Sequence, residues 1–412
     1  MCIRDSFDAD GFFGLHPNLA PLFNSIPRSE VTGAHAVATN AAFSGSHFEA
    51  FDLADRGNEP VGPGWMAAAA NANGLVLPTQ KVTMGYRPDE ALFGTRSVSI
   101  DSVANVQEAS AKFASVRSSI ERMYGGETVP GAYLGERQDQ DVATAMLSLI
   151  DAVDPVVPSS NENYPQSPEA PGLREAASLI KADLGVAMIA VNSGGINNGA
   201  RWDTHSGQSS TLRSMVGNLA DGLAAFRQDL GDHWNRTIVI VQTEFGRSVT
   251  RNGVTASGTQ HGIASAMLMM GGPIADGPGS GRILKRDWPG IRGDRAAQAG
   301  GYGEYVLPKA IDLRVPLREV LQKRMLYTNL DQVFPSFDPV ADPELGLLNW
   351  GADGDSNADG DVNDADVKAI LDQGVGNGGD EFIPERGDLN RDGKTDLLDA
   401  LMLAQQVDDQ PE

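Results

Sequence analysis

Three polar motifs lie close together in the sequence: Trp202-Asp203-Thr204-His205-Ser206-Gly207-Gln208, Thr243-Glu244-Phe245-Gly246-Arg247 and Gly258-Thr259-Gln260-His261-Gly262. Apolar runs typical of buried parallel strands lie beside them, at residues 185–191, 237–241 and 264–270. After the first motif, apolar residues recur at helical spacing, at Met215, Val216, Leu219, Leu223 and Phe226. The pattern therefore predicts an α/β fold in which polar loops join strands and a helix.

The polar motifs contain side chains of the kinds that bind metal ions. Asp203, His205, Glu244 and His261 each fall just after a predicted strand or just before the next one. Ligands bind at the carboxyl ends of strands in open parallel sheets, so we expect these side chains to converge there. Two imidazoles and two carboxylates suit zinc or manganese. The alternative is that each residue is a solvated loop residue or a hydrogen-bonded core group.

The motifs also resemble those of the family DUF1501, whose members are secreted bacterial proteins. The resemblance extends to residues 13–17, 45–50 and 313–326, and so covers roughly residues 10–330. It implies an alkaline-phosphatase-like and sulfatase-like fold, with a mostly parallel sheet flanked by helices and with Asp and His at strand ends holding metal ions. The family usually has Asp before the His of the third motif. This chain has Gln260 there, which removes one carboxylate near the predicted site.

Ser46 and Arg247 are the predicted catalytic residues. A hydroxyl at a helix N-terminus is well placed to meet an anionic ester, although Ser46 could instead cap its helix together with Glu49. The Arg247 guanidinium matches the oxygens of phosphate or sulfate, although it could instead form a surface salt bridge. The sequence leaves open whether His47 faces the site or packs inward.

Composition excludes several classes of protein. A chain of 412 residues can form one large domain and one small one. Its formal net charge of −23 argues against nucleic-acid binding, which needs a basic surface. No apolar run approaches the roughly 18 residues of a membrane span. Cys2 is the only cysteine, so there is no intrachain disulfide, and this does not decide the compartment.

The first six residues lack the basic start and apolar region of a signal peptide. Members of the family usually begin with an exported leader, followed by a strand and a loop that carries an acidic metal ligand. Neither feature precedes the match here. We therefore expect the chain to be incomplete at its N-terminus, with its leader missing, and the protein to be extracellular or periplasmic.

The C-terminal segment changes composition and contains a repeat. Residues 351–412 hold 17 Asp and Glu against 4 Lys and Arg. Two copies of a twelve-residue calcium-loop pattern lie there, with a glycine at the sixth position of each and a short apolar helix after each. The predicted calcium-site residues are Asp355, Asn357, Asp359, Asp361, Asn363 and Asp366 in one copy, and Asp388, Asn390, Asp392, Lys394, Asp396 and Asp399 in the other.

The alternative for this segment is an acidic disordered tail. Two complete loops with a following helix, and Asp in place of Glu at the last position, resemble a type I dockerin more than a paired helix-loop-helix calcium sensor. That resemblance implies a small α-helical module that holds two calcium ions and binds a cohesin domain of an extracellular assembly. The expected organisation is a large domain over residues 7–330, a linker over residues 331–350 and the module over residues 351–406.

Two functions of different classes are open at this point. The chain could be a secreted metal-dependent hydrolase of phosphate or sulfate esters, in which the metal activates water or Ser46 and Arg247 holds the anion. It could instead be a non-catalytic extracellular scaffold or binding protein that keeps the fold. Gln260 and the missing N-terminal ligand favour the scaffold.

Overall fold

The computed structural model describes part of the chain, with gaps, and all statements on structure refer to that part. The described residues are 7–8, 13–39, 46–75, 78–85, 89–112, 150–160, 164–192, 202–251, 257–275, 277–284, 286, 288, 290, 297–298, 305–325, 327, 329–348, 354, 356, 362–374, 387, 389 and 395–408. Contacts divide the chain into two units. The first unit comprises residues 1–17, 26–58 and 231–412, and the second comprises residues 18–25 and 59–230.

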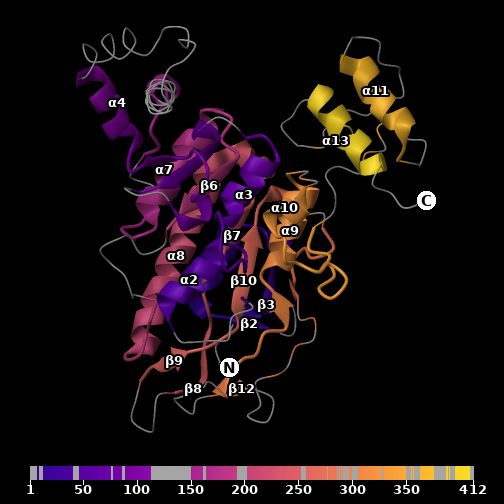
Figure 1. Cartoon of the computed structure of the whole chain (residues 1–412). Helices are drawn as coiled ribbons and strands as arrows, with labels where there is room; N and C mark the ends of the chain where they lie inside the picture. The colour runs from indigo at the N-terminus through magenta and orange to yellow at the C-terminus, as the bar shows by residue number, and fades with distance from the viewer. Residues whose placement is uncertain are drawn as a thin grey trace, which may run out of the picture. The chain divides into compact units, whose positions relative to one another are not determined.

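A mixed sheet forms the core of the first unit (Figure 1). Its strands are β3 (Val31–Ala38), β7 (Val239–Val241), β10 (Ser265–Met270), β11 (Ile283–Leu284) and β14 (Ile311–Asp312). The order is β11-β3-β10-β7, and β14 pairs with β3 beyond β11. β3 is buried along almost its whole length, as its run of small apolar residues predicts.

Strand direction in this sheet differs from the expected mostly parallel pairing. β10 is antiparallel to both β3 and β7, whereas β11 and β14 are parallel to β3. The register pairs Ser265 with Val37 and Leu268 with Val241. The start of β10 therefore lies at the edge where β3 and β7 end. The antiparallel direction brings the residues before β10 to the carboxyl ends of its neighbours, which is where the site forms.

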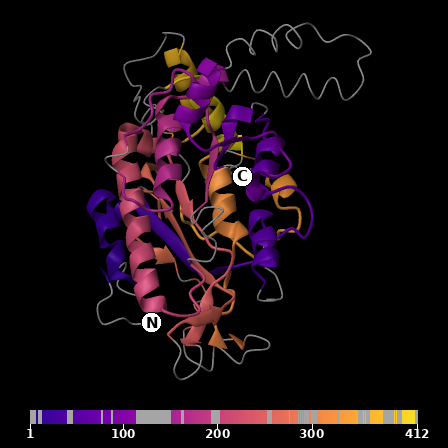
Figure 2. The same cartoon turned by 90° about the vertical axis from the view of Figure 1, so that its left-hand side faces the viewer.

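A separate parallel sheet lies in the second unit, in the order β5-β4-β6. Its strands are β4 (Lys81–Met84), β5 (Val98–Ile100) and β6 (Met188–Val191). Helix α7 (Ala170–Lys181) packs on β4 and β6. The long helix α8 (Gln208–Leu230), pink in Figure 2, packs on α7 and on α1 (Ala20–Ser25). The predicted strand at 185–191 thus exists in shorter form, but in a different sheet from β7 and β10.

The remaining elements are short. The helices are α2 (His47–Asp55), α3 (Trp65–Ala72), α4 (Val103–Lys112), α9 (Arg314–Lys323), α10 (Leu330–Val333), α11 (Asp364–Gly374) and α13 (Leu397–Asp408), and the strand pairs are β1 (Phe7–Asp8) with β2 (Gly14–Leu15), β8 (Arg247–Arg251) with β9 (Thr259–His261), and β12 (Ala297–Gln298) with β13 (Tyr305–Val306). In the described part of the chain, no helix has the length and apolar character that a membrane span requires.

The segment expected to be a linker is packed near both of its ends and largely exposed between them. Phe334, Leu347 and Leu348 are buried within the first unit. The buried carboxylate of Glu319 on α9 accepts hydrogen bonds from four consecutive backbone N–H groups, those of residues 345–348. We call residues 343–348 the strap. Because apolar burial and a carboxylate both hold it, the strap belongs to the packed unit.

The two helices of the C-terminal segment pack against each other around a small core. Ile370 of α11 and Ala400, Met402 and Leu403 of α13 are buried together with Leu389. Leu371 and Leu401, which the apolar pattern also includes, are exposed. Asp355, Asn357, Asp359, Asp361, Asp388, Asn390, Asp392 and Lys394 of the predicted calcium loops lie outside the described residues.

Candidate metal centre

Three segments of the first unit meet at one edge of its sheet. α2 follows β3 in the chain, Glu244 follows β7, and His261 ends β9 just before β10. The antiparallel direction of β10 places its start beside the ends of β3 and β7, so residues far apart in sequence become neighbours. This geometry explains why the second and third polar motifs, though about 15 residues apart, contribute to one site.

Gly246 and Gly262 allow the loops of the second and third motifs to cross with their backbones in direct contact. A Cβ at Gly246 would lie 1.8 Å from the Ala264 carbonyl oxygen, and one at Gly262 would lie 2.6 Å from the Arg247 backbone. The crossing is closed by hydrogen bonds from Gly246 N to Ile263 O at 3.1 Å and from Gly262 N to Gly246 O at 2.6 Å. Only glycine fits at this distance, so these residues fix the positions of Glu244 and His261 on either side.

His47 is oriented by a carboxylate. Its Nδ1 lies 2.9 Å from Glu244 Oε1, and both side chains are partly buried. When a metal ion takes the Nε2 lone pair, the proton of the neutral imidazole is on Nδ1, where the Glu244 carboxylate can accept a hydrogen bond from it. This arrangement, in which a carboxylate fixes the tautomer of an imidazole, is common around metal-binding histidines.

Aromatic contacts hold the two imidazoles side by side. The ring centroids of His47 and His261 lie 4.5 Å apart at 74°. The buried ring of Phe245 contacts both, at 4.9 Å from His47 and 4.6 Å from His261. Phe245 therefore restricts the rotation of both rings, and it comes from the same motif as Glu244.

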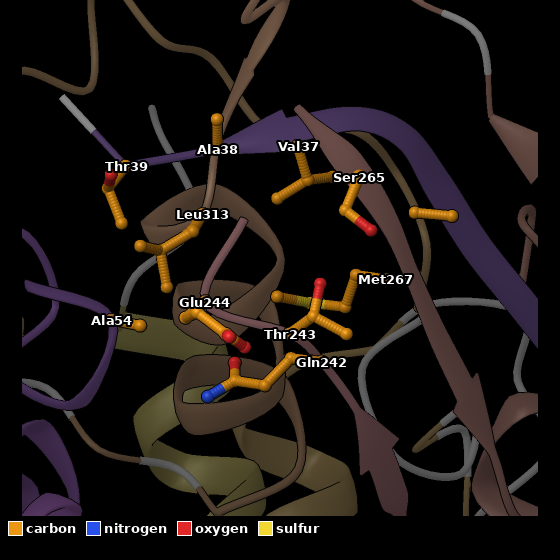
Figure 3. A pocket seen from close by; sticks show the side chains of 11 residues that line it. Val37, Ala38, Thr39, Ala54, Gln242, Thr243, Glu244, Ser265, Met267 and Leu313 are labelled. Atoms are coloured by element: carbon orange, nitrogen blue, oxygen red, sulfur yellow. The ribbon is translucent and has the colours of Figure 1, made fainter. Parts of the chain in front are cut away.

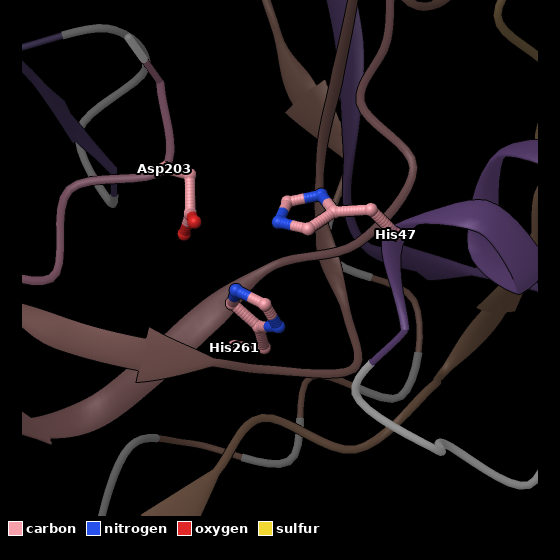
Figure 4. Close-up of side chains that lie close together, drawn as sticks. All are labelled: His47, Asp203 and His261. Atoms are coloured by element: carbon pink, nitrogen blue, oxygen red, sulfur yellow. The ribbon is translucent and has the colours of Figure 1, made fainter. Parts of the chain in front are cut away.

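Among the described residues, His47, Asp203 and His261 form a group that could hold a metal ion. Each offers one ligand atom, and these atoms lie within 4.8 Å of one another; Figure 4 shows the three side chains pointing toward a common space. Asp203 Oδ1 also lies 2.9 Å from His205 Nε2. Two imidazole nitrogens and one carboxylate oxygen are a donor set that suits zinc or manganese.

The structure thus divides the predicted metal ligands into two kinds. Asp203 and His261 belong to the ligand group, whereas Glu244 and His205 each contact a member of it through a hydrogen-bonding atom. The sequence did not decide the position of His47. His47 could have been recognised as a ligand from its place in a polar segment between a strand and a helix, because the other ligands lie in similar segments.

Ser46 and Arg247 lie close in sequence to members of this cluster. Ser46 precedes His47 at the N-cap position of α2 in an extended conformation, and its side chain makes no capping hydrogen bond. Arg247 pairs with His261 across β8 and β9, and its guanidinium donates to Thr259 Oγ1 at 3.1 Å and to the Thr259 carbonyl oxygen.

A pocket of the first unit lies against Glu244. Figure 3 shows Glu244, Gln242, Thr243 and Ser265 among its lining residues. Its volume is about 20 Å³, which is enough for a water molecule and not for a substrate. Glu244 therefore lines this pocket and also contacts His47. A substrate would have to approach the imidazoles from another direction.

The described calcium-loop residues repeat one local geometry. Asp366 Oδ2 accepts from Asn363 N at 3.0 Å, and Asp399 Oδ2 accepts from Asp396 N at 2.8 Å. Both Asp366 and Asp399 have no exposed side-chain surface. The two copies of the sequence repeat therefore begin their helices in the same way.

Comparison with known families gives one match. The model of the family described as Protein of unknown function (DUF1501) matches residues 16–283, which include the whole metal centre and exclude the C-terminal helices. No curated protein and no solved structure matches the chain. Because the family model covers more than half of the 412 residues, the chain belongs to the DUF1501 family.

Proposed function

We propose that this chain is an exported metal-dependent hydrolase of phosphate or sulfate esters, built on an alkaline-phosphatase-like architecture. The observation that carries the proposal is the group formed by His47, Asp203 and His261. Structural zinc sites usually have four protein ligands, whereas catalytic sites have three and leave a position for water or substrate. A bound zinc or manganese ion would polarise an ester oxygen and lower the pKa of a bound water.

The protein's own residues would prepare this chemistry in two ways. Glu244 accepts the Nδ1 proton of His47 and so directs the Nε2 lone pair toward the ion. His205 Nε2 lies 2.9 Å from Asp203 Oδ1 and would so orient the carboxylate that belongs to the ligand group. Ser46, beside His47 and at the N-terminus of α2, is the candidate nucleophile.

Arg247 supports the proposal less strongly than the metal group does. Its Nε and Nη2 atoms are engaged with Thr259, which orients the guanidinium on the β8–β9 hairpin beside His261. In this role Arg247 would supply positive charge to an anionic ester from the β8–β9 hairpin rather than enclose the anion.

We further propose that residues 351–406 are a dockerin-like module that holds two calcium ions and docks on a cohesin-type domain. The sequence spacing of the two loops supports it, as does the matching geometry at the starts of α11 and α13. Burying Asp366 and Asp399 in an acidic segment is unfavourable by itself, and a divalent cation would offset that cost.

A protein partner is suggested by the surface of α13. Leu397, Leu398 and Leu401 are more than half exposed and lie on adjacent turns. Clustered exposed leucines on a short helix are typical of a protein-binding surface.

A non-catalytic scaffold is the second candidate. Gln260 replaces a carboxylate that the family usually has, and Arg247 already has protein partners. Under this function the chain would keep the fold and bind metal weakly or not at all.

A turnover screen with aryl phosphate and aryl sulfate esters tests the hydrolase. It uses the zinc- or manganese-loaded full chain, with His261→Ala as the inactive reference. Hydrolysis by the parent chain that the substitution abolishes supports the enzyme. Equal rates in both, or metal binding without turnover of any ester, support the scaffold.

The module is tested by limited proteolysis of the full chain with calcium and with chelator. We expect residues 351–406 to be protected by calcium and cleaved in chelator, because only a cation offsets the repulsion among the carboxylates. Asp355→Ala with Asp388→Ala should abolish the difference. Protection that is the same in chelator would reject calcium-dependent folding, and cleavage in both states would support the disordered acidic tail.

A further inference from the structure

Two large aromatic side chains are exposed beside a member of the metal group. Phe48 is 86 % exposed and Phe51 is 46 % exposed, and both lie on α2 directly after His47. By contrast, Phe245, which contacts the same imidazole within the first unit, is buried. Exposed phenyl rings are unfavourable in water, so two of them next to a candidate ligand invite a functional explanation.

Helical geometry places these rings and the imidazole on one face. At about 100° per residue, His47, Phe51 and Phe48 fall in that order within an arc of roughly 100°. Ala50 and Ala54 are buried and mark the side of α2 that faces the core. From that side the helix surface therefore leads first to His47, then to Phe51 and then outward to Phe48.

The imidazole of His47 and the phenyl ring of Phe51 are neighbours on α2. The ring centroids of His47 and Phe51 lie 6.2 Å apart, with an angle of 28° between the planes. An ester oxygen held near His47 Nε2 would place its alcohol substituent within reach of the Phe51 face. The Glu244 pocket, which has room only for water, does not offer a competing place for that substituent.

Charge on α2 restricts what the rings can accept. The Asp52 side chain, about one helical turn after Phe48, is 48 % exposed, with Arg56 at 3.5 Å as a partner. An anionic substituent on the alcohol would be repelled here, and a neutral ring with a flat apolar face would not.

We propose that Phe48 and Phe51 form a platform that binds the neutral ring of the ester's alcohol, and so select aryl or sugar esters over small alkyl esters. This inference rests on the proposed function for the position of the ester group. The two phenyl rings would bind the alcohol by stacking, and both aromatic and sugar rings can stack on a phenyl face.

The test compares Phe48→Ala/Phe51→Ala with the parent in the metal-loaded full chain. Phe93→Ala, which removes a 68 % exposed phenyl from the second unit, is the matched control. We expect KM for phenyl phosphate to rise about tenfold in the double variant, and KM for ethyl phosphate to change less than about twofold. The KM of Phe51→Leu for phenyl phosphate should lie between those of the parent and the double variant, because leucine keeps the apolar bulk without a ring. Glucose 1-phosphate in place of phenyl phosphate distinguishes a sugar from an aryl preference.

A binding measurement separates this inference from the hydrolase. Phenylphosphonate and methylphosphonate, which are not hydrolysed, are titrated calorimetrically into the zinc-loaded parent and double variant. Tighter binding of phenylphosphonate that the double variant loses supports the platform even when no ester is turned over. Equal binding of the two phosphonates, no binding, or a preference that survives the double substitution overturns it.

Discussion

Glu244 decides which nitrogen of His47 is available to a metal ion. The sequence suggested Glu244 as a direct ligand, because carboxylates at strand ends often bind metals. In the structure its Oε1 lies 2.9 Å from His47 Nδ1, and such a contact orients a ligand. Spacing along a chain identifies the residue types that reach a site, but not which of two adjacent groups touches the ion. That choice depends on side-chain packing between segments about 200 residues apart.

Glu244→Gln should weaken zinc binding by about 10- to 100-fold without unfolding the protein. The amide can still accept from Nδ1, but it no longer stabilises the charge on the imidazole. Competition with a chelating dye measures the affinity. Glu49→Gln, on the same helix as His47, is the control and should leave the affinity unchanged; an equal loss in both variants would contradict the role given to Glu244.

Asp312 is a buried residue on which stability depends. Burial opposes its ionisation, but hydrogen bonds from Arg314, at 2.9 and 3.1 Å, prevail and hold its pKa below the usual range. Asn58 donates to both carboxylate oxygens at 3.0 Å. Asp312→Asn would leave the buried Arg314 charge uncompensated, so we expect a loss of about 3–5 kcal/mol in the free energy of unfolding at pH 7.

The lowered pKa of Asp312 also determines how the stability of the protein depends on pH. A carboxylate with a lowered folded pKa stabilises the protein above its unfolded pKa of about 3.9, and this stabilisation is lost as pH falls through the folded pKa. Urea unfolding should therefore show a large difference between the parent and Asp312→Asn at pH 7 that shrinks in acid. Asp331→Asn, at a side chain that is 94 % exposed, should show no measurable effect at either pH. A difference that is independent of pH would contradict this assignment.

At the scale of elements, the position of the site follows from the direction of β10. The apolar run at 264–270 predicted a buried strand, and β10 confirms it, but the run carries no information on direction. A parallel β10 would place its start, and His261, at the opposite edge from Glu244. Strand pairing is set by the whole sheet, so this part of the site could not be derived from local pattern alone.

Gly246→Ala should abolish metal binding. The new Cβ would lie 1.8 Å from the Ala264 carbonyl oxygen, so the loops that carry Glu244 and His261 would have to separate. Gly217→Ala on α8 is the control, because its Cβ has ordinary space and alanine favours a helix. Metal content of the two purified variants measures the effect, and a Gly246→Ala protein with full metal content would show that the crossing is not required.

At the scale of the whole molecule, the strap extends the packed unit beyond the segment that composition suggested. The sequence predicted a linker over residues 331–350, yet Glu319 and the buried Leu347 and Leu348 hold its C-terminal part. Composition reports local preference and cannot show that a distant buried carboxylate collects four N–H groups. By contrast, the mixed α/β class and the helix over α8 could be predicted, because both depend on long periodic patterns.

A chain that ends at residue 342 should be less stable than one that ends at residue 348. The shorter chain loses two buried leucines, each contributing about 1.5–3 kcal/mol, and leaves the Glu319 carboxylate buried without the strap's donors. Denaturant midpoints of the two truncated proteins measure the difference. Equal midpoints would show that the strap contributes nothing to the unit.

The metal content of the purified protein shows directly whether His47, Asp203 and His261 form a metal centre. Elemental analysis of the purified full chain, in buffer with excess calcium, should find about one equivalent of zinc or manganese. His47→Ala, Asp203→Ala and His261→Ala should each lose it, whereas His233→Ala, at a histidine that contacts Arg236 elsewhere in the first unit, should retain it. A parent chain that holds only calcium, or ligand variants that keep their zinc or manganese, would contradict the metal centre on which the proposed hydrolase depends.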